Sequence, residues 1–235
     1  MSHASAAVLH GAPTWGLRLD LVHVTHFSGG GRTGARVIHH EGECRVVDVT
    51  RANGHWLTTP ARTALDVATE RGAEVGIVVA SDFLNRGLTS RDELIQLADT
   101  QTHWPNSLAH HVVLQVADGR FESVGEARTG HLFWRYHLPP PVPQREIRLP
   151  DGRLVAQVDF AWPELGVFAE FDGRIKYTRL RRPGESIEDA VLREKRREEM
   201  IVELTGWRVI RLTWADLESP DATIARVRRL LSRAA

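Results

Sequence analysis

The chain has 235 residues, in which 30 Lys and Arg balance 30 Asp and Glu, and 42% of the residues are hydrophobic. This composition predicts a globular protein and excludes disordered, collagenous and disulfide-framed classes, because the single Cys44 cannot pair within the chain. No apolar run approaches the roughly 18 residues that cross a bilayer, and the start lacks a signal-peptide pattern, so we expect a cytoplasmic protein. A net charge of zero argues against bulk attraction to nucleic acid but allows a local basic surface.

Charges and histidines are unevenly distributed between the two halves. Residues 1–120 hold 10 Arg, no Lys and 10 of the 12 His, whereas residues 121–235 hold 18 Arg and both Lys. One helical pattern stops at Asp118-Gly119 and another begins after it, which predicts a domain boundary near residue 118. We therefore expect a smaller mixed α+β domain over 1–118 and a second domain over 119–235.

The first half is predicted to begin with strands and to continue with helices. Val46–Val49 and His55–Thr58 flank Asn53-Gly54, a pair typical of a hairpin turn. Thr59-Pro60 marks a helix start, because a capping hydroxyl precedes a proline at the first helical position. The expected elements are strands over 17–26, 35–40, 46–49 and 55–58, then helices from residue 60 and over 75–84, 90–98 and 107–116.

The second half is predicted to have the order α-β-β-β-α-β-α. Three strand patterns are separated by turn residues, Pro150-Asp151-Gly152 and 162–166, which favours an antiparallel meander. The expected elements are a helix over 123–137, strands over 144–149, 154–160 and 167–171, a charged helix over 187–204, a strand over 207–213 and a helix from about residue 221.

Acidic residues come together on the predicted hairpin of 154–160 and 167–171. If its turn centres near Glu164, Asp159 lies opposite Glu170, and the two-residue period places Gln157 and Asp172 on the same face. Like charges across two strands destabilise a sheet, and a hard divalent cation such as Mg²⁺ compensates them. The alternative interpretation is an exposed acidic strand face that binds no metal.

Paired histidines do not by themselves predict a metal site. His39-His40, His110-His111 and His23 with His26 have no Cys or acid beside them at ligand spacing. We therefore expect ordinary surface histidines at these positions.

Four segments of the second half resemble a known family: 157–164 (QVDFAWPE), 168–177 (FAEFDGRIKY), 193–200 (REKRREEM) and 206–217 (GWRVIRLTWADL). Together they resemble an uncharacterised actinobacterial domain related to very-short-patch-repair endonucleases, within the PD-(D/E)xK nuclease superfamily. The resemblance covers about residues 121–232. It implies an α/β (α+β) fold with a restriction-endonuclease-like core, a mixed sheet flanked by helices.

The resemblance also implies a catalytic site. Asp159 matches the hairpin aspartate that binds Mg²⁺, with Mn²⁺ as a substitute, and Glu170 matches the second acid. Glu126 matches an acid on the first helix that often completes the site, although a first-turn Glu is equally explained by the helix dipole. The superfamily lysine normally lies two positions after the second acid, where this chain has Asp172. Lys176 is therefore the expected lysine.

Several basic residues are predicted to contact nucleic acid, because the arginine side chain presents a fixed fork of donors that suits phosphate. They are Arg174, Arg179, Arg181 and Arg182 after the hairpin, and Lys195 and Arg197 on the charged helix. Lys195 is also a second candidate for the catalytic lysine. The alternative is that Lys195 lies on the solvated face of a charged helix and has no catalytic role.

The first half more loosely resembles the region that follows a winged helix in abortive-infection type IV antitoxins. The matching residues are 5–11, 22–25 and 57–66, in which Thr63 and Asp66 are expected to be capping and surface positions. Two functional classes stay open. One is a Mg²⁺-dependent DNA endonuclease or nickase in repair or defence. The other is an inactive nuclease-fold DNA-binding regulator or antitoxin-like protein with a protein partner from a toxin–antitoxin or defence system.

Overall fold

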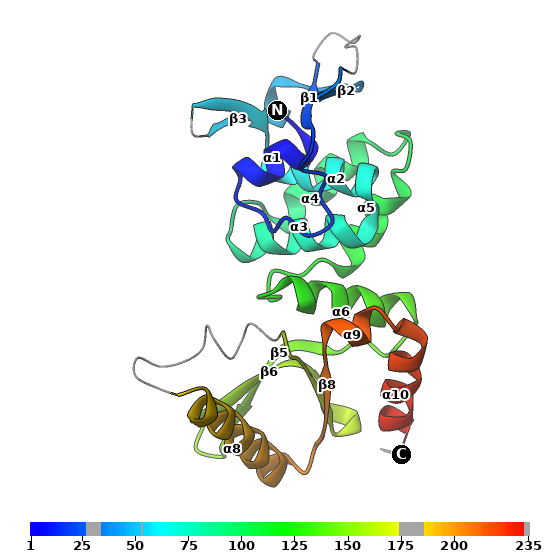
Figure 1. Cartoon of the computed structure of the whole chain (residues 1–235). Helices are drawn as coiled ribbons and strands as arrows, with labels where there is room; N and C mark the ends of the chain where they lie inside the picture. Colours follow the sequence, from blue (N-terminus) through cyan, green and yellow to red (C-terminus); the bar gives the residue numbers. More distant parts are fainter. Residues whose placement is uncertain (27–33, 53, 174–185, 233–235) are drawn as a thin grey trace. The chain divides into compact units, whose positions relative to one another are not determined.

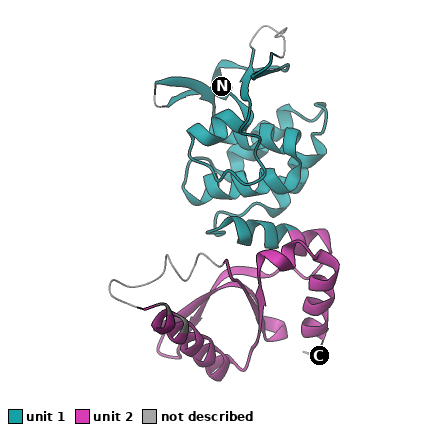
Figure 2. Cartoon of the chain, in the orientation of Figure 1, with its two compact units in different colours: residues 1–131 teal, residues 132–235 magenta. Residues whose placement is uncertain are grey.

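The computed structural model describes residues 1–26, 34–52, 54–173 and 186–232 (Figure 1). The chain packs into two compact units, unit 1 over residues 1–131 and unit 2 over residues 132–235 (Figure 2). The division falls within helix α6 (Val124–Arg135), whereas the predicted boundary at residue 118 lies just before that helix. None of the helices in the described ranges has the length and apolar content that a membrane span requires.

Unit 1 is a mixture of short strands and helices. In chain order its elements are α1 (His3–Leu9), β1 (Val22–Thr25), β2 (Val37–His40), a 3-10 helix (Val46–Asp48), β3 (Val49–Ala52), β4 (His55–Thr58), α2 (Pro60–Arg71), α3 (Ala73–Asn85), α4 (Arg91–Thr100), α5 (Leu108–Val116) and most of α6. β1 pairs with β2 in parallel, and β3 pairs with β4 antiparallel. The predicted strands do precede helices α2 to α5, but the expectation that this half begins with strands is wrong, because helix α1 comes first.

The predicted hairpin forms, but its first arm starts later than expected. Ala52 pairs with His55, so the two strands flank the predicted turn. Residues 46–48 form a 3-10 helix instead of a strand, because the side chain of Asp48 accepts a hydrogen bond from the backbone N–H of Arg45 at 2.8 Å. This local bond holds the backbone in a turn before the strand begins.

Helices α2 and α3 form the centre of unit 1 and approach each other closely. Thr59 caps α2 by accepting a hydrogen bond from Arg62 N at 3.4 Å, as the sequence predicts. A Cβ atom at Gly76 of α3 would lie 2.4 Å from the Cβ of Ala68 on α2. Only glycine fits this contact, and both helices carry fully buried side chains, such as Leu65 on α2 and Ile77 on α3.

Unit 2 is built on a four-stranded sheet in the order β5-β6-β7-β8. Its elements are β5 (Val142–Arg148), β6 (Leu154–Trp162), a 3-10 helix (Pro163–Leu165), β7 (Val167–Phe171), α8 (Ile187–Thr205), β8 (Arg208–Leu212), α9 (Trp214–Leu217) and α10 (Pro220–Ser232). The first three strands form the predicted antiparallel meander, and β8 pairs with β7 in parallel. The short α9 is an addition to the predicted order, and Thr213 caps it with Asp216.

The hairpin of β6 and β7 has the predicted register. Phe160 pairs with Ala169 and Trp162 with Val167, and the turn between them closes at Gly166, which has a left-handed φ of 55°. The preceding position on β6 is Asp159, and the following position on β7 is Glu170. The register therefore places these two acids beside each other, where the last pair of the ladder ends.

Helices pack on both sides of this hairpin. Phe133, in the last turns of α6, packs against Phe160 and Trp162 with ring centres 5.4 and 5.2 Å apart. Ile201 of α8 packs with Ala161 and Phe168. Because strand residues two apart share a face, Asp159 and Glu170 lie on the face that α8 covers.

Candidate functional site

The acid pair of the hairpin is partly withdrawn from water. Glu170 is buried, and Asp159 is half-buried. The carboxylate Oδ2 of Asp159 accepts a hydrogen bond from the backbone N–H of Phe171 at 2.8 Å. Burial raises the pKa of Glu170 above its ordinary value, and the negative charge of Asp159 adds to the rise while Arg197 opposes it. The two carboxyl groups therefore interact across the strands.

Arg197 of α8 is directed at this acid pair. Its Nη2 donates to Oε1 of Glu170 and, at 2.5 Å, to Oε1 of Glu194, and its Nη1 donates to the backbone oxygen of Gln157 at 3.1 Å. Burial opposes the charge of Arg197, but the two glutamates together raise its pKa above the ordinary value. Arg197, a predicted nucleic-acid contact, thus supplies positive charge to the hairpin acids.

A second arginine, Arg211 of β8, lies near Asp172, the residue that follows β7. Asp172 donates its backbone N–H to Leu212 O at 2.7 Å, which extends the pairing of β7 with β8. Nη1 of Arg211 lies 4.0 Å from Oδ2 of Asp172, and Nη2 of Arg211 lies 2.6 Å from Glu198 of α8. Asp172 therefore belongs to a second set of ion pairs, formed with Arg211 of β8 and Glu198 of α8.

Two further predicted site residues, Lys195 and Glu126, have other contacts. The side chain of Lys195 is 71% exposed, and its Nζ lies 3.8 Å from Oε1 of Glu199. Lys195 therefore lies on the solvated face of α8. Glu126 is buried in unit 1, where its two oxygens accept hydrogen bonds from Ser123 Oγ at 2.7 Å and Glu122 N at 2.9 Å. Glu126 thus acts as a cap at the start of α6.

Five predicted residues fall outside the described part of the chain. They are the expected catalytic Lys176 and the expected nucleic-acid contacts Arg174, Arg179, Arg181 and Arg182.

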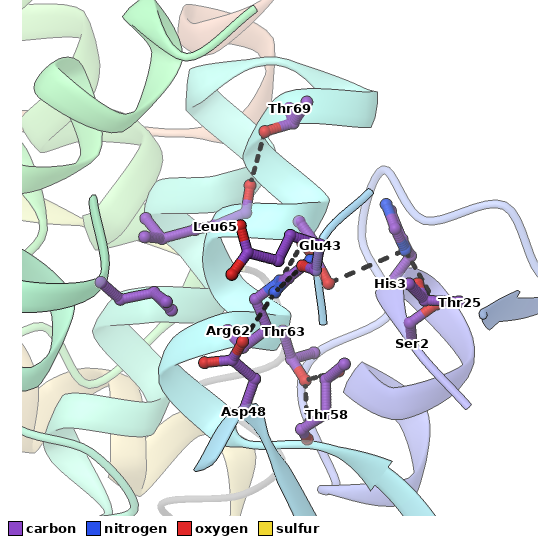
Figure 3. Close-up of polar contacts among 12 residues, drawn as sticks. Ser2, His3, Thr25, Glu43, Asp48, Thr58, Arg62, Thr63, Leu65 and Thr69 are labelled. Atoms are coloured by element: carbon purple, nitrogen blue, oxygen red, sulfur yellow. Dashed lines mark hydrogen bonds and ion pairs between the residues drawn. The ribbon is translucent and has the colours of Figure 1, made fainter. Parts of the chain in front are cut away.

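Unit 1 contains a separate, deeply buried ion network around Arg62 of α2 (Figure 3). Its Nε donates to Asp66 at 2.7 Å, and its Nη1 donates to Asp48 at 3.3 Å and to the backbone oxygen of Glu43 at 3.0 Å. The expectation that Thr63 and Asp66 lie at the surface is wrong, because both are buried. Burial raises the pKa of Asp66, and the adjacent Arg62 opposes the rise. The arginine makes the burial of two aspartates possible.

The expectation of surface histidines is wrong at His110, which is buried with its Nε2 2.8 Å from Thr69 Oγ1, and at His23, which also has an acidic neighbour. His23 of β1 is fully buried, and its Nδ1 lies 2.9 Å from Nε2 of His40 on β2 and 3.6 Å from Oε2 of Glu70 on α2. The three residues are far apart in the sequence, so no local spacing reveals them. The signals that point to this cluster are the excess of histidines in the first half and the pairing of the two strands that carry His23 and His40.

Comparison with known proteins finds two similar sequences. Both are uncharacterised proteins of Mycobacterium tuberculosis, one from strain CDC 1551 / Oshkosh and one from strain ATCC 25618 / H37Rv. Each is 29% identical to this chain over 185 residues, which make up 78% of this chain and 65% of the relative. The match thus spans slightly less than two thirds of the relatives' length. No family model matches the chain, and no solved structure matches it significantly.

Proposed function

We propose that the C-terminal region is a metal-dependent endonuclease that hydrolyses phosphodiester bonds in DNA, with its site on the β6–β7 hairpin. The observation that carries the proposal is the hairpin register, which sets Asp159 beside the buried Glu170 on the face covered by α8. Acids on a core hairpin are costly unless a cation compensates them. A site that brings two carboxylates together at this cost is a candidate for chemistry that uses the charge.

The donor set fits Mg²⁺, which binds carboxylate oxygens and keeps several waters. Asp159 uses Oδ2 and Glu170 uses Oε1 in the contacts described above. We assign the metal to the carboxylates of Asp159 and Glu170 together. When bound, the ion would polarise the scissile phosphate and lower the pKa of a bound water.

The protein's own residues position these ligands. The N–H of Phe171 holds the Asp159 carboxylate against β7, and Arg197 holds the Glu170 carboxylate from α8. Because Arg197 favours the ionised form of Glu170, it keeps this group available as a ligand although burial favours the protonated form. Lys176 is the group that we propose to orient the attacking water, and Asp172 forms a separate ion pair with Arg211.

A second function, an inactive DNA-binding regulator of the antitoxin-like kind, is favoured by one observation. Arg197 already supplies a positive charge to Glu170, so this buried acid is compensated by the protein itself. In this alternative the network has a structural role, and DNA binding requires no divalent ion.

Cleavage assays separate the two functions. Supercoiled plasmid, linear duplex and single-stranded DNA are each incubated with Mg²⁺, Mn²⁺ or chelator and with the wild type, Asp159→Asn or Glu170→Gln. Glu164→Gln is the matched control, because Glu164 is an exposed acid in the turn of the same hairpin. We expect metal-dependent cutting by the wild type and the control, and a loss of at least about 100-fold in both site variants.

Two results would contradict the nuclease. If none of the four proteins cuts DNA, and all four shift duplex DNA equally with metal or chelator, the protein is the DNA-binding regulator and not a nuclease. If Glu170→Gln cuts as well as the control, the metal assignment on the hairpin is wrong.

A further inference from the structure

We propose that unit 1 holds a divalent transition-metal site of the Zn²⁺ type, formed by His23, His40 and Glu70. This inference is independent of the proposed nuclease function, because all three residues belong to unit 1. Among the described residues, these are the three potential metal ligands whose ligand atoms all lie within 4.8 Å of one another.

Strand pairing brings the two histidines to one face. β1 and β2 run parallel with His23 opposite Ile38 and Thr25 opposite His40. Side chains two apart on a strand share a face, so His23 and His40 point to the same side, and His39 points to the other. The ladder thus places the His23 and His40 rings next to each other, with Nδ1 and Nε2 2.9 Å apart.

Helix α1 fixes the position of His23 on that face. The backbone N–H of His23 donates to Ser5 Oγ at 2.9 Å, and its backbone oxygen accepts from Ser2 N at 3.0 Å. The ring of His3 stacks on the ring of His40, with centres 3.4 Å apart. Both histidines are therefore held by neighbours on α1 and not only by each other.

Helix α2 supplies the third donor. Oε2 of Glu70 lies 3.6 Å from Nδ1 of His23, too far for a good hydrogen bond. This oxygen is buried and has no hydrogen-bond partner within the described ranges. A buried carboxylate oxygen without a partner is costly, and a cation at this point would remove the cost.

The spacing of the donors suits a tetrahedral ion. Bonds of about 2.0–2.1 Å at tetrahedral angles place neighbouring ligand atoms roughly 3.4 Å apart. The distances of 2.9 Å and 3.6 Å from His23 Nδ1 lie on either side of this value, so small side-chain shifts admit the ion. Two imidazoles and one carboxylate form a donor set typical of Zn²⁺, whereas Mg²⁺ prefers oxygen ligands alone.

The absence of a metal from this cluster is a distinct and testable alternative. In that case one ring N–H donates to the other ring, and the pair is an ordinary buried hydrogen bond. Bound metal would add a link from β1 and β2 to α2, which the hydrogen bond does not provide. Metal binding and thermal stability therefore rise together if the proposal is correct.

The test uses the full chain, stripped with a chelator and dialysed. Zn²⁺ binding is measured by calorimetry and by elemental analysis after gel filtration, and thermal unfolding is recorded with and without Zn²⁺. The site variants are His40→Ala and Glu70→Gln. His39→Ala is the matched control, because His39 is the next residue on the same strand but faces the other side.

We expect one Zn²⁺ per chain and a higher melting temperature with Zn²⁺ for the wild type and His39→Ala. Both site variants should bind at least tenfold more weakly and lose the shift in melting temperature. Circular dichroism without metal shows whether each variant is folded, and Glu70→Asp replaces Glu70→Gln if the latter is not.

Three results would overturn the proposal. The first is that the wild type does not bind Zn²⁺, and the second is that both site variants bind Zn²⁺ as tightly as the wild type. The third is that His39→Ala loses Zn²⁺ binding as His40→Ala and Glu70→Gln do. The last result would assign the ion to the His26–His39 pair, whose ring nitrogens also contact each other. Glu170→Gln should keep full Zn²⁺ binding, which separates this test from the test of the nuclease.

Discussion

Both units contain an arginine between two carboxylates, but they bury it to different depths. In unit 1 the Arg62 side chain is 2% exposed, and its partners Asp48 and Asp66 are 5% and 3% exposed. In unit 2 the Arg197 side chain is 28% exposed, and Glu194 is 27% exposed. The same residue types therefore form one network from which water is excluded and one that water reaches in part. Removal of the arginine should cost more stability in the first than in the second.

We expect the greatest loss of stability when the buried cation of Arg62 is removed. Arg62→Met keeps most of the side-chain volume but leaves Asp48 and Asp66 without their shared arginine. We expect unit 1 to lose about 3–5 kcal/mol of stability, the usual cost of breaking a buried ion pair. Urea unfolding followed by tryptophan fluorescence measures it, because Arg62 lies 4.7 Å from the ring centre of Trp104.

Arg86→Met is the control for this prediction. Arg86 pairs with Asp82 at the surface of α3, so we expect a loss below about 1 kcal/mol. Adding Asp66→Asn to Arg62→Met should restore part of the stability, because it removes one uncompensated charge. Equal losses in Arg62→Met and Arg86→Met would show that the depth of burial does not distinguish the two networks.

An intermediate effect is expected from Arg197→Met in unit 2. Glu170 would lose its partner, but the Arg197 side chain is itself 28% exposed, so we expect a smaller loss of about 1–2 kcal/mol at neutral pH. Urea unfolding of this variant and of Arg62→Met gives the direct comparison. A loss as large as that of Arg62→Met would mean that Arg197 is a structural residue, which favours the regulator over the nuclease.

A pH series tests the electrostatics of Glu170 itself. Burial raises its folded pKa above the unfolded value of about 4.3, so the folded state holds the proton more tightly. The stability that this group contributes is present below the unfolded pKa and is lost as the pH rises through the folded pKa. Glu170→Gln cannot ionise and should escape this loss.

The measurement compares the free energy of unfolding of the wild type with that of Glu170→Gln at each pH. The free energy of unfolding of Glu170→Gln minus that of the wild type should increase from pH 4 upward, by at most about 1.4 kcal/mol per pH unit, and then level off. Glu164→Gln is the matched control for the loss of one carboxylate from the same hairpin. A difference that decreases with rising pH would mean that the folded pKa is lowered.

The smallest effect is expected at Lys195. Its side chain is 71% exposed and pairs only loosely with Glu199, so Lys195→Ala should change the free energy of unfolding by less than about 0.5 kcal/mol. Urea unfolding at low and high salt checks this value. A loss above about 1 kcal/mol would indicate that Lys195 belongs to the ion network of α8.

Local signals predicted most of the fold. The capping hydroxyl before Pro60, the turn residues between strands and the two-residue alternation of β6 and β7 each act over a few neighbouring residues. The register that sets Asp159 beside Glu170 follows from turn length and alternation alone. The partners Arg197 and Arg211 were not assigned to these acids, because a helix face and a parallel strand meet the hairpin only after long-range packing.

The residue pattern predicts most of the helices and strands, with α1 and α9 as exceptions, and it predicts the hairpin register and the position of the acid pair, because these depend on short-range backbone preferences. Long-range packing buries Asp66 beside Arg62 and brings His23, His40 and Glu70 together. Burial and ligand geometry are set by contacts between distant segments. Neither the periodicity nor the spacing of residues in one segment carries that information.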